Sequence, residues 1–97
     1  MALLEQLPRD LVSALGVSGA RSLSGGDSAN AFRLETGNGP VFAKTMPHPA
    51  PGVLPLEAAA LEKLRAVAPE EISVPAVRFV SEEALALEWI EEAHGRN

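Results

Sequence analysis

The sequence contains no cysteine, which excludes disulfides, thiolate nucleophiles and cysteine-based zinc sites. Basic residues are scarce as well. Eight Lys and Arg against 13 Asp and Glu give a net charge of −5, which argues against a nucleic-acid-binding surface. No apolar run approaches the roughly 20 residues that a membrane-spanning helix needs. His48 and His94 are far apart and have no partner at ligand spacing, so the sequence predicts no metal site.

The remaining composition is that of an ordinary globular domain. The 97 residues are 46% hydrophobic and 22% charged, which suits a single domain with a modest core. The N-terminal residues "MALLEQLPRDL" include acidic side chains and a proline, unlike a signal peptide. These features predict a cytoplasmic protein.

Hydrophobic periodicity predicts the secondary structure. Leucines at positions 4, 7, 11 and 15 have helical spacing, with Pro8 near the helix start and Gly16 as its C-terminal cap. Alternating residues and the turn sequence "TGNGP" then predict strands, and "LPLEAAALEKLRAVA" predicts a long helix. The predicted order after the first helix is strands at 20–24, 31–35 and 41–45, a helix at 54–68, and strands at 77–80 and 84–90. The last strand is apolar enough to be buried on both faces.

This order predicts an α+β fold. We expect a twisted antiparallel sheet of about five strands with the long helix packed on one face, preceded by a short N-terminal helix. On a helical wheel the buried face of the long helix is predicted to contain five residues: Ala60, Leu61, Leu64, Val67 and Ala68.

Two charged residues fall on predicted apolar faces. Lys44 shares a strand face with Phe42, and Glu57 lies in the same helical arc as the predicted buried residues. A buried charge is costly unless it is paired, and each of these two satisfies the other. The alternatives are that Glu57 is favoured by the helix dipole in the first turn and that Lys44 extends to a sheet edge. The paired interpretation predicts a distance of roughly 4 Å or less between the two groups.

The segment "LSGGDSANAFRL" contains a loop of small residues that is longer than a tight turn requires. Small residues allow backbone N–H groups to approach an anion closely. Together with a strand lysine held by a helix glutamate, such a loop is typical of a nucleotide phosphate site.

With these features the sequence resembles the N-terminal lobe of the fructosamine (ketosamine-3-) kinase family. That family has a protein-kinase-like fold and is similar to aminoglycoside phosphotransferases and choline kinases. The resemblance covers about residues 23–92, and the segments that carry it are "LSGGDSANAFRL", "VFAKT", "LPLEAAALEKL", "VPAVRFV" and "LALEWIEE". The paired glycines followed by a polar pair and Asn are its most specific feature.

The resemblance implies a role for each site residue. Lys44 would bind the α- and β-phosphates of ATP, and Glu57 would position Lys44. Phe42 would help to wall the adenine pocket. The hinge, whose backbone would hydrogen-bond adenine, would consist of Glu88, Trp89 and Ile90. The nucleotide-covering loop would contain Gly25, Gly26, Asp27, Ser28 and Asn30. The redox-sensitive cysteine that some members carry in this loop is absent.

The sequence lacks other family motifs. The catalytic Asp of a His-Gly-Asp segment, an Asn and a metal-binding Asp belong to the family's C-terminal lobe. The resemblance therefore implies that this chain is one lobe of a larger enzyme, with Mg²⁺ held mainly by the other lobe. The predicted organisation is an N-terminal helix at 1–16, a nucleotide-binding lobe at 17–92 and the start of a linker at 93–97.

Two other functions remain open from the sequence. An aminoglycoside- or choline-type phosphotransferase would share this lobe, and a non-catalytic α+β interaction domain would share its shape. The expected partners are ATP and a ketosamine or other small amine or sugar substrate, without nucleic acid or membrane. We also expect self-association, because Phe42, Leu87, Trp89 and Ile90 would form an exposed apolar patch and the first strand an open edge.

Overall fold

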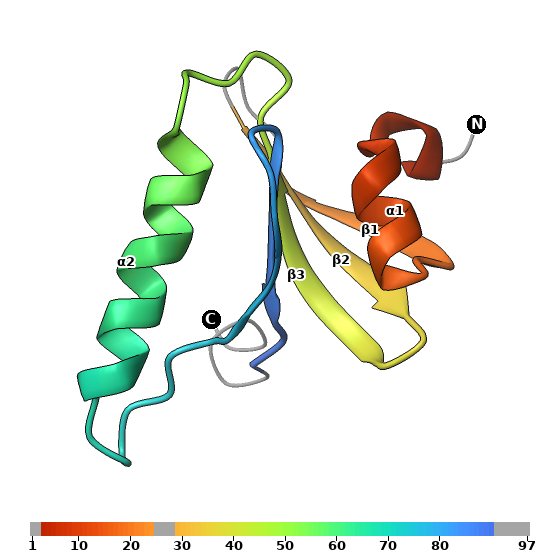
Figure 1. Cartoon of the computed structure of the whole chain (residues 1–97). Coiled ribbons are helices and arrows are strands. Elements are labelled where there is room, and N and C mark those ends of the chain that lie inside the picture. Colours follow the sequence, from red (N-terminus) through yellow and green to blue (C-terminus); the bar gives the residue numbers. More distant parts are fainter. Residues whose placement is uncertain (1–2, 25–28, 91–97) are drawn as a thin grey trace.

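The computed structural model describes residues 3–24 and 29–90. Within these residues the chain forms a 3₁₀ helix, two α-helices and one five-stranded antiparallel sheet with the strand order β1-β2-β3-β5-β4 (Figure 1). The elements are η1 (Leu3–Gln6), α1 (Arg9–Leu15), β1 (Gly19–Ser24), β2 (Asn30–Thr36), β3 (Gly39–Thr45), α2 (Val53–Val67), β4 (Val77–Val80) and β5 (Ala84–Glu88). The predicted α+β class and element order are confirmed.

The N-terminal helix has the two end residues that the sequence predicts, Pro8 and Gly16, but Leu4 and Leu7 lie outside it. Pro8 is the N-cap of α1, a position where its missing N–H costs no helical hydrogen bond. Gly16 ends the helix in the left-handed conformation, with φ of 61°, and its N–H donates to the carbonyl of Val12. The residues before Pro8 form the separate 3₁₀ turn η1.

Replacing Gly16 by Ala should destabilise the fold by about 1 kcal/mol, because a side chain is strained at positive φ. Gly37→Ala is the matched control, since Gly37 does not have a positive φ and a Cβ there would meet nothing within 4 Å. Thermal unfolding of both variants measures the difference. Equal melting temperatures would contradict the proposed strain at Gly16.

The sheet is covered on both faces. Figure 1 shows α2 on one side of the sheet and η1 with α1 on the other, and we call these sides the α2 face and the α1 face. The core of the α1 face contains Leu7, Leu11, Val17, Phe32, Leu34, Val41, Ala43, Ala84 and Ala86. The core of the α2 face contains Leu54, Ala58, Leu85 and Leu87, with Phe42, Met46, Leu61 and Val77 packed against it. Strand β5 therefore contributes to both cores, which confirms its predicted burial on both faces.

The predicted buried face of the long helix is wrong in most of its members. Leu54 and Ala58 are buried, whereas Leu64 and Val67 are 52% and 77% exposed. The reason is length. A helix of 15 residues extends about 22 Å, but the neighbouring β4 and β5 have only four and five residues, or roughly 13–17 Å. In Figure 1 the C-terminal half of α2 leans away from the sheet.

The expected exposed apolar patch is also wrong in part. Leu87 is 9% exposed because it packs beneath α2 with Leu54 and Ala58. Phe42, Trp89 and Ile90 are half-buried. Self-association stays a prediction, although β1 does lie at the edge of the sheet.

Candidate functional site

Lys44 lies on the α2 face of the sheet. It is the sixth residue of β3, and its register partners are Ala31 on β2 and Leu85 on β5. Residues opposite one another in antiparallel strands share a face, so Lys44 is on the same face as the buried Leu85. Phe42, two residues earlier, is on this face as well.

Helix α2 places Glu57 beside this lysine. Leu54 and Ala58 anchor the first turns of α2 on the sheet, and Glu57 lies between them in sequence. The Nζ atom of Lys44 is 2.9 Å from Oε1 and 3.1 Å from Oε2 of Glu57. The side chains keep 32% and 38% of their surface exposed. The predicted ion pair is confirmed, and it leaves the lysine partly accessible to a ligand.

The described residues on either side of the glycine loop lie near Lys44 in the strand register. Gly25, Gly26, Asp27 and Ser28 lie outside the described residues, so their predicted role stays a prediction. Ser24, the last residue of β1, pairs with Ala31, which in turn pairs with Lys44. The strand register thus brings Ser24 to the row of the sheet that contains the lysine.

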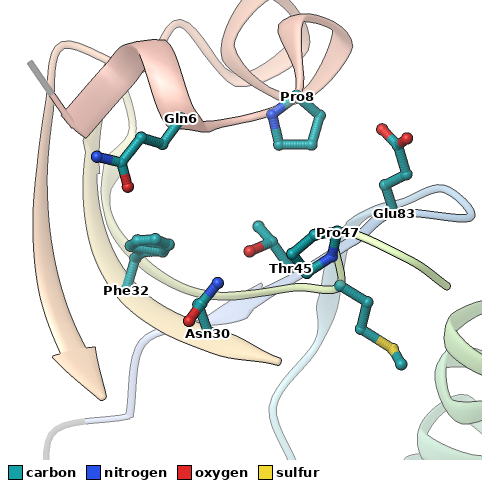
Figure 2. A pocket seen from close by; sticks show the side chains of 8 residues that line it. Gln6, Pro8, Asn30, Phe32, Thr45, Pro47 and Glu83 are labelled. Carbon is teal, nitrogen blue, oxygen red and sulfur yellow. The ribbon is translucent and has the colours of Figure 1, made fainter. Parts of the chain in front are cut away.

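Asn30 lies on the other face. It is the first residue of β2 and pairs with Thr45, so both are on the α1 face. There it lines a cavity with Phe32 and Thr45 (Figure 2). The structure therefore does not place the Asn30 side chain beside Lys44.

The predicted hinge follows directly from β5. Glu88 is the last residue of that strand, and Trp89 and Ile90 come after it. The N–H of Glu88 donates to the carbonyl of Ala76 at 2.8 Å, and the Glu88 side chain accepts from the N–H of Ala76 at 3.1 Å. Glu88 thereby fixes the start of β4. Because the N–H of Glu88 is already used in this way, adenine at the hinge would have to hydrogen-bond other backbone groups of residues 88–90.

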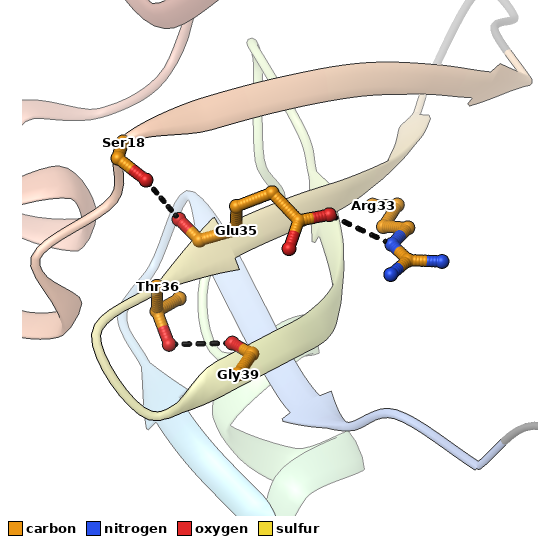
Figure 3. Close-up of polar contacts among 5 residues, drawn as sticks. All are labelled: Ser18, Arg33, Glu35, Thr36 and Gly39. Atoms are coloured by element: carbon orange, nitrogen blue, oxygen red, sulfur yellow. Dashed lines mark hydrogen bonds and ion pairs between the residues drawn. The ribbon is translucent and has the colours of Figure 1, made fainter.

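One interaction on the α2 face was not found from the sequence. The guanidinium of Arg33 lies over the ring of Trp89, with 4.9 Å between Cζ and the ring centroid. Arg33 also forms an ion pair with Glu35 at 2.9 Å (Figure 3). Arg33 is the β2 register partner of Phe42, the residue predicted to wall the adenine pocket. The contact between Arg33 and Trp89 therefore crosses β3 next to Phe42. Alternation along β2 identifies the face of Arg33, but no local signal links it to Trp89.

Arg33→Ala should make Trp89 more accessible and lower the free energy of unfolding by about 1 kcal/mol, since an exposed cation–π contact and ion pair contribute little. Trp89 is the single tryptophan of the sequence, so acrylamide quenching of its fluorescence measures this directly. Arg21→Ala is the control, because Arg21 is the exposed β1 partner of Arg33. Quenching that is the same in both variants would contradict the stack.

Residues 3–24 and 29–90 contain no group of three or more His, Asp or Glu side chains that could hold a metal ion. Within the same ranges, every helix is too short or too polar to cross a bilayer.

The fold of this chain is similar to part of a known crystal structure. The sequence matches no protein-family model and no curated protein. The chain is similar to a crystal structure from Thermobifida fusca YX-ER1 described as a "putative fructosamine-3-kinase", with a TM-score of 0.69 and 24% sequence identity. The similarity covers 82% of this chain and 29% of the other, so the chain spans less than a third of that protein. The resemblance predicted from the sequence is confirmed for the fold: the chain has the fold of part of that protein.

Proposed function

We propose that this chain forms the ATP-binding lobe of a cytoplasmic small-molecule kinase of the fructosamine type, which phosphorylates ketosamines. The observation that carries the proposal is the Lys44–Glu57 pair on the α2 face. A lysine near the end of the central strand of the sheet, held by a helix carboxylate, supplies a point charge for phosphate groups.

The residues around this pair fit a nucleotide. Lys44 has three N–H donors, and the two Glu57 oxygens leave donor capacity for a phosphate oxygen. Ser24, which precedes the glycine loop in sequence, is in register with Ala31 and Lys44, and this supports a phosphate-binding role for the loop. Phe42 lies one row further along the same face, towards Trp89 and Ile90. In this proposal the adenine base of ATP lies against Phe42.

ATP, when bound, supplies the phosphoryl group that is transferred. In our proposal the residues of this chain bind and orient the nucleotide. Phosphoryl transfer also needs a base and Mg²⁺ ligands, which we assign to a second lobe of the intact enzyme. The ketosamine substrate would be recognised mainly there.

A titration of the ¹⁵N-labelled chain with ATP tests the proposal. We expect saturable chemical-shift changes on the α2 face at Ala31, Phe42 and Lys44, with a dissociation constant on the order of 1 mM because one lobe supplies only part of the site. Inorganic tripolyphosphate should affect the region of Lys44 but not that of Phe42. Shifts confined to the α1 face, or none with ATP, would contradict the proposal.

The coding sequence provides an independent test. An in-frame continuation beyond Asn97 into a His-Gly-Asp segment is expected for a kinase. A reading frame that stops at Asn97 would instead favour the non-catalytic interaction domain.

A further inference from the structure

The cavity lined by Asn30, Phe32 and Thr45 lies on the α1 face, on the opposite side of the sheet from Lys44. Its volume is about 340 Å³, within the range of small-molecule sites. The η1–α1 junction forms one wall, the paired ends of β2 and β3 form the floor, and the turn before β5 forms the rim. The Lys44 ammonium is on the other side of the sheet, so this cavity is separate from the proposed nucleotide site.

Thr45 supplies a polar group at the floor of this cavity. The residue is only 6% exposed, yet no hydrogen bond joins its hydroxyl to any other residue within 3–24 and 29–90. Figure 2 shows this hydroxyl pointing into the open space between Gln6, Phe32 and Asn30. The residue is buried but its hydroxyl oxygen is not closed off, so it offers one donor and two acceptor positions to a molecule in the cavity.

The charge of the lining limits the type of ligand. Among the described residues that line the cavity, Glu83 is the one ionisable side chain. Its backbone carbonyl accepts a hydrogen bond from the N–H of Met46 at 2.8 Å, which holds the turn, and so Glu83, at the rim. The described part of the lining has this one carboxylate and no cationic side chain, and the chain has a net charge of −5, so a cation is favoured over an anion.

The rest of the lining is apolar or neutral. Pro8, Phe32, Met46 and Pro47 provide apolar surface, and the amides of Gln6 and Asn30 provide hydrogen-bonding groups at the edge. We propose that this cavity binds a small primary amine with an apolar, ring-sized body, whose ammonium group donates to the Thr45 hydroxyl while the Glu83 carboxylate at the rim attracts its charge. This proposal does not depend on nucleotide binding at Lys44.

Three ligands of the same shape test the proposal on the intact chain: 2-phenylethylamine, 2-phenylethanol and phenylacetate. In ¹H–¹⁵N titrations we expect the amine to give saturable shifts at Phe32, Asn30 and Thr45, with a dissociation constant on the order of 1 mM. The alcohol should bind several-fold more weakly and the acid not at all. Equal shifts with all three ligands, or no saturable shifts with the amine, would overturn the proposal.

Two variants locate the ammonium group. Glu83→Gln should weaken amine binding about fivefold without changing binding of the alcohol, because it removes only the charge. Glu71→Gln is the control, since it changes the net charge equally at an exposed position outside the cavity. Thr45→Val, which keeps the shape, should weaken the amine about twofold to tenfold. Amine affinity that falls equally in the two glutamate variants would overturn the assignment to Glu83, whether or not Thr45→Val folds.

Discussion

Lys44→Met is expected to lower the affinity of the chain for ATP at least tenfold, to the point where saturable shifts on the α2 face are lost. A charge-assisted hydrogen bond from an ammonium to a phosphate contributes about 1.5–3 kcal/mol, and tenfold corresponds to about 1.4 kcal/mol. Met keeps the length and the apolar stem of the side chain but removes its three donors. The ATP titration of the ¹⁵N-labelled variant measures the change.

The matched control is Lys63→Met. Lys63 is exposed on α2, so this variant makes the same chemical change and the same change in net charge away from the site. Glu57→Gln should weaken ATP binding less than Lys44→Met does, because it removes the group that positions the lysine and not the donor itself. Loss of affinity that is equal in the Lys44 and Lys63 variants would show a general charge effect and contradict the site.

These changes should leave the fold nearly intact. The Lys44–Glu57 pair is more than a third exposed on the glutamate side, and pairs of this kind contribute between 0 and about 1 kcal/mol. Thermal unfolding of the Lys44→Met and Glu57→Gln variants therefore distinguishes lost binding from lost structure. The position of the pair, and not its strength, is what matters for the proposed function.

The ion pair could be predicted from the sequence because both charges break a local pattern. Lys44 interrupts an alternating strand and Glu57 lies next to apolar helix positions, so burial forces the two to meet. The double burial of β5 was predictable for a similar reason. Its run of apolar residues, "ALALEWI", leaves no polar face for solvent.

Other features depend on contacts between residues far apart in the sequence, which hydrophobic periodicity cannot predict. The stack of Arg33 on Trp89 joins a residue of β2 to the residue just after β5, and β3 lies between these two strands in the sheet. The cavity on the α1 face is lined by four separate segments, around residues 6–8, 30–32, 45–47 and 83. The placement of Asn30 on that face follows from its pairing with Thr45, whereas the sequence assigned it to the loop.

Which apolar residues of α2 are buried also cannot be predicted from periodicity. A helical wheel identifies apolar positions, but the length of the neighbouring strands decides which of them are covered. Leu54 is fully buried and Leu64 is 52% exposed on the same helix. Leu54→Ala should therefore destabilise the protein by about 3 kcal/mol, which lowers the Tm by roughly 12–24 °C for a domain of this size.

Leu64→Ala should change the free energy of unfolding by no more than about 0.5 kcal/mol, since little apolar contact is lost and Ala has the higher helix propensity. The two variants make an identical chemical change in one helix, so the difference between their melting temperatures measures which part of α2 contacts the sheet. Equal destabilisation would mean that the C-terminal half of α2 is also packed. Leu54→Ala should in addition loosen Glu57 from Lys44, because Leu54 anchors the turn from which Glu57 projects.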